Sequence, residues 1–98
     1  MNIEIYTPLP GVPTYIVRYI KEMIRLARLQ DSRIDNASVT LMETGHFDTN
    51  WYICEVGFTV HGQSFLITKR ADSYFEAAYD ASRDLFNKVN NNTFFNYN

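Results

Sequence analysis

Residues Trp51 to Arg70 read WYICEVGFTVHGQSFLITKR, two strand-like segments on either side of a short turn. In the first segment every second residue is apolar, a period of two that is typical of a strand with one buried face. These positions are Tyr52, Cys54, Val56, Phe58 and Val60. The dipeptide His61–Gly62 suits a tight turn. The stretch therefore predicts a β-hairpin whose second strand runs from Gln63 to Arg70, with Phe65 and Ile67 on one face.

Two further strands are expected on the N-terminal side of this hairpin. Residues 34–43 alternate between apolar and polar side chains, and residues 2–7 do the same over a shorter length. The apolar members are Ile3, Ile5, Ala37, Val39 and Leu41. Residues 44–50 are polar, so we expect a loop between the two longer strands.

Two helices complete the pattern. Thr14 is the expected cap of the first helix, which ends near Gln30, and Asp72 or Ser73 is expected to cap the second. The apolar positions of the first are Ile16, Ile20, Met23, Ile24 and Ala27. Those of the second are Phe75, Ala78, Tyr79, Leu85, Phe86 and Val89. Both sets recur at helical spacing, so each helix has one face to bury.

The expected order is β-α-β-β-β-α, an α+β fold. An antiparallel four-stranded sheet with both helices packed on one face buries this pattern economically. We expect a single domain over residues 1–89, followed by a flexible, Asn-rich tail over residues 90–98.

Composition limits the classes of function. The chain has 98 residues, 46% of them hydrophobic, and a net charge of −2. Cys54 is the only cysteine, which excludes an intramolecular disulfide and a Cys-rich zinc site. The first residues lack the basic and apolar regions of a signal peptide, and no apolar run is long enough to cross a membrane. We therefore expect a cytoplasmic protein with no membrane partner.

The first helix carries an unusual concentration of cations. They are Arg18, Lys21, Arg25 and Arg28, and Glu22 is the only acid of this helix. At 100° per residue the four cations fall within an arc of about 80°, away from the apolar face. We call them the cationic ridge. A phosphate backbone requires such a surface, although a plain solvated helix face is the alternative explanation.

The remaining charges are distributed differently. Lys69 and Arg70 end the last strand and are expected to extend the ridge if the two helices lie side by side. The second helix has acids at every fourth position, Asp72, Glu76, Asp80 and Asp84. These acids suit the positive N-terminal end of a helix dipole and also form a candidate surface for a basic protein partner.

Several stretches together resemble one known family. Residues 19–22 through 32–34 look like the first helix and following turn of the ribosome hibernation-promoting factor family, also called the ribosome-associated inhibitor or sigma-54 modulation family. Residues 71–80, with Phe75-Glu76-Ala77-Ala78-Tyr79-Asp80, look like the opening of that family's second helix. Val39-Thr40-Leu41 and the hairpin around Gly62 are similar to its middle strands, so the resemblance spans roughly residues 2–89.

The resemblance implies binding in the channel of the small ribosomal subunit, with basic residues of both helices on 16S rRNA. It also implies a hibernation or stress factor that regulates translation. The positions that match the family's basic character are Lys21, Arg25 and Lys88, and Arg18 and Arg28 add to it. Two departures from the family pattern predict that this chain binds rRNA more weakly than a typical member, or with a different footprint. Met23 replaces a customary lysine, and the end of the second helix, residues 88–92, is nearly uncharged.

Other chemistry has little support in the sequence. His46 and His61 lie in predicted turns, while Cys54 points to the buried face, so we expect no catalytic site, metal, cofactor or small-molecule substrate. Phe94, Phe95 and Tyr97 could stack on bases, dock on another chain or pack back on the fold. The alternative to an RNA-binding regulator is a protein-interaction module on the same fold that has lost RNA binding.

Overall fold

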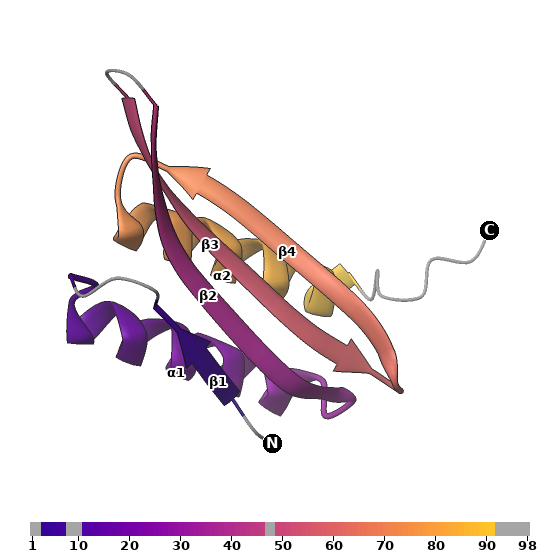
Figure 1. Cartoon of the computed structure of the whole chain (residues 1–98). Coiled ribbons are helices and arrows are strands. Elements are labelled where there is room, and N and C mark those ends of the chain that lie inside the picture. Colours follow the sequence, from indigo (N-terminus) through magenta and orange to yellow (C-terminus); the bar gives the residue numbers. More distant parts are fainter. Residues whose placement is uncertain (1–2, 8–10, 47–48, 92–98) are drawn as a thin grey trace.

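The computed structural model describes residues 3–7, 11–46 and 49–91, and it has a four-stranded sheet with two helices on one face (Figure 1). The elements are β1 (Ile3–Tyr6), α1 (Thr14–Gln30), β2 (Ile34–His46), β3 (Thr49–Val60), β4 (Gln63–Ala71) and α2 (Tyr74–Asn91). The predicted α+β fold and the predicted order of elements are confirmed.

The sheet is mixed rather than antiparallel. Its strand order is β1-β2-β3-β4, and the three longer strands pair antiparallel. Strand β1 pairs parallel with β2, so that Ile5 lies opposite Val39. The expectation of a wholly antiparallel sheet is therefore wrong at this edge. The reason is that α1 forms a crossover, which returns the chain to the sheet in its original direction.

The two hairpins of the sheet differ in length. His61 and Gly62 both have positive φ, of 51° and 79°, as the predicted tight turn between β3 and β4 requires. The expected loop over residues 44–50 is wrong, because β2 and β3 continue to pair as far as His46 opposite Thr49. Figure 1 shows this end of the hairpin projecting beyond the helices. Polar composition suits it because Glu43 and Thr44 are exposed there.

The core lies between the sheet and the helix layer. Helix α1 buries Ile16, Ile20, Ile24 and Ala27, four of the five positions that its apolar spacing predicts, and Met23 is half-buried. Helix α2 instead buries small side chains, together with Leu85; they are Ala77, Ala78, Ala81 and Ser82. The predicted burial of Phe75 and Tyr79 is wrong, because these rings are 41% and 43% exposed. Small residues allow α2 to lie close to β3 and β4, which turns the larger rings toward α1.

The helix ends follow local chemistry. Pro13, with φ of −59° and ψ of 142°, precedes the first helical residue, so the predicted cap at Thr14 is wrong. The predicted cap at Ser73 is confirmed, because its Oγ accepts a hydrogen bond of 3.1 Å from the Glu76 amide. Helix α2 continues to Asn91, two residues into the predicted tail, and residues 92–98 lie outside the described part of the chain.

Candidate nucleic-acid interface

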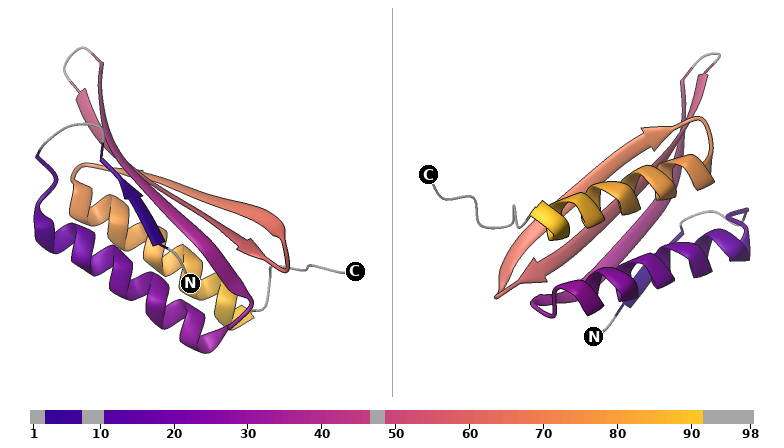
Figure 2. Two further views of the ribbon diagram at one scale, coloured as in Figure 1. Left: turned by 60° about the horizontal axis from the view of Figure 1, so that its bottom comes forward. Right: turned by 180° about the vertical axis from the view of Figure 1, so that it is seen from behind.

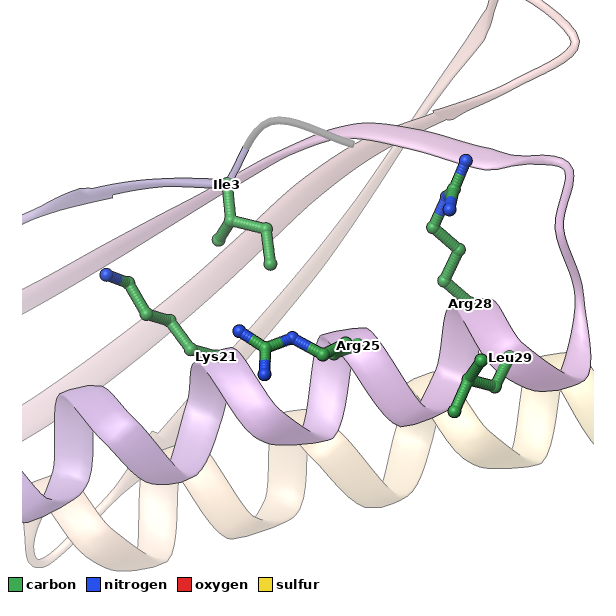
Figure 3. A pocket seen from close by; sticks show the side chains of 5 residues that line it. All are labelled: Ile3, Lys21, Arg25, Arg28 and Leu29. Atoms are coloured by element: carbon green, nitrogen blue, oxygen red, sulfur yellow. The ribbon is translucent and has the colours of Figure 1, made fainter.

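Three of the four residues of the cationic ridge lie on the flank of α1 that faces β1. Lys21, Arg25 and Arg28 line one surface hollow of about 400 Å³, together with Ile3 of β1 and Leu29. Figure 3 shows the three cationic side chains on the same side of α1 as Ile3. The ridge is positioned there because the opposite flank of α1 packs against α2. The hollow is therefore lined by three positively charged side chains and by two apolar ones, Ile3 and Leu29.

The four ridge cations differ in how firmly they are held. Arg28 is half-buried, and its Nε donates a hydrogen bond of 3.1 Å to the carbonyl oxygen of Ile34. Arg25 contacts Glu22 at 3.3 Å in a well-exposed pair, which water and salt weaken. Within the described residues, Arg18 and Lys21 are exposed and form no ion pair. Three of the four side chains can therefore reorient toward an external anion.

Lys69 and Arg70 lie away from the ridge, on opposite faces of the sheet. Lys69 points to the helix side and approaches Asp84 of α2 at 3.9 Å. Arg70 points to the other face, where its guanidinium lies 4.6 Å from the centre of the Trp51 ring. The two helices lie side by side, which was the condition for Lys69 and Arg70 to extend the ridge. However, α2 and the width of the sheet separate these residues from the ridge. They do not extend it, and their contact with RNA stays a prediction.

Lys88 belongs to a small charge cluster on α2. Its Nζ lies 3.2 Å from both carboxylate oxygens of Asp84, the same acid that Lys69 approaches. Asp72, which precedes α2, and Glu76 and Asp80 of α2 are exposed. The structure therefore has four of the predicted cations on α1, two, Lys69 and Lys88, beside Asp84, and Arg70 on the other face of the sheet.

Two of the groups considered for enzymatic chemistry, Cys54 and His61, do not converge. Cys54 is fully buried in the core, and this burial, reinforced by the charge of Glu55, raises the pKa of its thiol to about 12. His61 occupies the exposed turn between β3 and β4. Across residues 3–7, 11–46 and 49–91, no group of three His, Cys, Asp or Glu side chains could hold a metal ion. No helix in this part of the chain is long and apolar enough to cross a membrane.

Comparison with solved structures finds the same fold in other proteins over nearly the whole chain, and two of them are described here. A ribosomal subunit interface protein from Coxiella burnetii aligns with a TM-score of 0.75 at 9% identity, covering 95% of this chain and 98% of that one. The fold is the same. The N-terminal domain of Protein Y from Thermus thermophilus aligns with a TM-score of 0.73 at 16% identity, covering 93% of this chain and 98% of that one.

Sequence comparison adds nothing to this result. No family model matches the chain, and no curated protein matches it in sequence. At 9% and 16% identity, the structural likeness establishes the fold, including the β-α-β-β-β-α order and the mixed sheet. It also agrees with the family whose motifs the chain resembles, since a ribosomal subunit interface protein shares this architecture.

Proposed function

We propose that the chain is a ribosome-associated translation regulator that binds the rRNA of the small ribosomal subunit. The observation that carries the proposal is the likeness, over 95% of the chain, to a ribosomal subunit interface protein. The motif resemblance supports the same family independently, because it rests on short stretches of sequence rather than on the backbone. A non-enzymatic, cytoplasmic factor involved in hibernation or stress agrees with both.

The ridge is the proposed main contact with RNA. Arg18, Lys21 and Arg25 project from one flank of a rigid helix and have no strong internal ion pair among the described residues. Phosphate groups bind such donors largely without sequence preference, and the shape of the RNA supplies the remaining selectivity. Arg28 takes part from a more fixed position, since it is bonded to Ile34.

The other predicted RNA contacts have a smaller part in the proposal. Lys69 and Lys88 share Asp84 as a partner, so an RNA phosphate has to compete with this carboxylate. Arg70 is exposed on the open face of the sheet and is available only to a ligand that reaches that face. We propose that these three residues modulate affinity and that the ridge determines it.

A charge reversal on the ridge tests the proposal. Lys21→Glu combined with Arg25→Glu should abolish co-sedimentation with 30S subunits, because two phosphate contacts become repulsive. Both side chains are exposed, so circular dichroism should show an unchanged fold. The matched control, Lys21→Arg with Arg25→Lys, keeps both charges and should retain binding. Undiminished co-sedimentation of the reversed variant would refute the assignment of the ridge.

A second candidate function follows from the exposed acids of α2. Glu76 and Asp80 have no cation paired to them among the described ion pairs, unlike Asp84. A basic protein could bind there if RNA binding has been lost. In that case Glu76→Gln with Asp80→Asn would remove partner capture, whereas the reversed ridge would leave it intact.

A further inference from the structure

An exposed apolar stripe follows the line along which α1 and α2 meet. We call it the apolar seam; it consists of Tyr15, Tyr19 and Leu26 from α1 and Phe75, Tyr79 and Phe86 from α2. Tyr19 and Phe86 are half-buried, and the other four are exposed. The rings form a chain of contacts, with centres 6.5 Å apart for Tyr15 and Phe75, 5.4 Å for Tyr19 and Phe75, and 6.3 Å for Phe75 and Tyr79. Tyr15 is 60% exposed. A contiguous exposed patch of this kind marks an interaction site.

The two helices are in register along the seam. Figure 2 shows them side by side and running in the same direction on one face of the sheet. Tyr19 lies between Phe75, whose ring centre is 5.4 Å away, and Ser82, with which its hydroxyl interacts, and the seam residues recur at the same intervals on both helices. Every residue of a helix rises by the same length along its axis. Arg18 therefore lies at about the same height along the two helices as Ala78, and Glu22 at about the same height as Ser82; we call such residues level.

Charges of opposite sign border the seam. On α1, Arg18 and Lys21 lie on the flank away from α2, where Lys21 faces the hollow beside β1. On α2, Asp80 lies on the flank toward β4, where it shares a surface hollow with Lys69. The acids of this flank would repel a nucleic-acid strand running along the seam. A protein whose charges have the complementary arrangement would be attracted.

A second copy of the chain has that arrangement. A two-fold axis parallel to the seam lays each α1 over the α2 of the other copy and brings the two seams together. Residues that are level within one chain stay level across the interface. Arg18 then lies between the levels of Glu76 and Asp80 of the second copy, and Lys21 lies close to the level of that Asp80.

In the first two pairs the base is on α1 and the acid on α2, and in a third pair this order is reversed. Glu22 lies one residue from the level of Arg83 of the second copy, so an acid on α1 meets a base on α2. Both side chains are exposed and free to change partners, since the Glu22–Arg25 contact is an exposed pair and Arg83 stands 5.8 Å over the Tyr79 ring. A two-fold axis across the helices would instead bring α1 over α1, and the ridges would repel.

We propose that the helix layer is a self-association surface through which two copies form a symmetric dimer, with seam against seam and α1 against α2. The alternation of charge specifies one orientation, and the rings supply the apolar contact. The proposal concerns the chain alone. Because Arg18 and Lys21 also belong to the cationic ridge, the second copy and RNA would compete for these two side chains.

Sedimentation equilibrium of the purified chain, over a wide range of concentrations and without ribosomes, tests the proposal. The wild type should show a reversible monomer–dimer equilibrium, and Tyr79→Lys should remain monomeric because it places a charge in the seam. Arg83→Glu and Glu22→Arg should each weaken the dimer by about tenfold. The double variant with both changes should restore it, because each pair across the interface is attractive again.

Three results would overturn the proposal. One is a wild type that stays monomeric up to the highest soluble concentration, which would show that the seam does not bind a second copy of the chain. Another is a double variant no tighter than either single variant, and the third is a dimer that none of these substitutions affects. Circular dichroism of each variant separates lost association from lost folding. Gln63→Glu, at the exposed first residue of β4, is the control that should leave the dimer unchanged.

Discussion

Individual side chains in this protein acquire unusual chemistry from where the fold places them. The Cys54 thiol is enclosed by the core, and desolvation raises its pKa from an ordinary 9.0 to about 12. Tyr19 and Tyr74 also have raised pKa values, with burial as the main cause. Asp31 shows the reverse effect, since hydrogen bonds from Arg33 lower the pKa of its carboxyl group.

The buried thiol predicts a loss of stability in alkali. Between pH 9.0 and about pH 12 the unfolded chain loses the Cys54 proton while the folded chain keeps it. The stabilisation is therefore complete below that range and disappears as the pH rises through it. Thermal melts should be recorded at about pH 8 and about pH 10.5. The decrease in Tm between these two pH values should be smaller for Cys54→Ala than for the wild type. Equal decreases in the two proteins would contradict the assignment.

The Asp31–Arg33 pair predicts a loss of stability in acid. Two guanidinium contacts, of 2.6 and 2.8 Å, join Arg33 to the Asp31 carboxylate at the end of α1. Asp31→Asn should lower the free energy of unfolding by about 1–2 kcal/mol at neutral pH. The difference should shrink as the pH falls through the lowered pKa of Asp31, because the wild type then loses the same charge. Urea denaturation measures the free energy of unfolding of each variant. Asp80→Asn, at an exposed position, is the control and should change this free energy little.

At the scale of elements, what could be predicted depended on periodicity. The alternation of residues 51–60 and the helical spacing of α1 follow directly from burial of one face, so the sequence was sufficient for both. The pairing of β2 with β3 beyond Glu43 was not predicted, because the exposed end of this hairpin lacks the alternation of apolar and polar side chains that indicates a strand. The start of α1 was missed by one residue because Pro13, which offers no capping side chain, precedes the helix.

Helix α2 gives a local test of capping. Ser73→Ala removes the oxygen that accepts a hydrogen bond from the Glu76 amide. The substitution should reduce the free energy of unfolding by about 1 kcal/mol in a denaturant titration. Ser64→Ala changes the same side chain at an exposed position of β4 and should have a much smaller effect. Equal effects for the two variants would show that the cap is energetically unimportant.

At the scale of the whole molecule, topology decides which charges act together. The spacing on α1 was enough to predict that its four cations share one flank. Strand period alone places the adjacent Lys69 and Arg70 on opposite faces, but their distance from the ridge depends on the strand order and on α2 lying between. The parallel pairing of β1 and the exposure of Tyr79 likewise depend on how the helices cross the sheet, which no local pattern encodes.

The measurement that we would make first is co-sedimentation of the chain with 30S subunits over a series of salt concentrations. If the four ridge cations each contact a phosphate, the logarithm of the binding constant should fall against the logarithm of salt with a slope of about −3 to −4. Lys21→Glu with Arg25→Glu should abolish the binding. No binding even at low salt, or binding that is independent of salt, would contradict the assignment of the chain as an rRNA-binding factor.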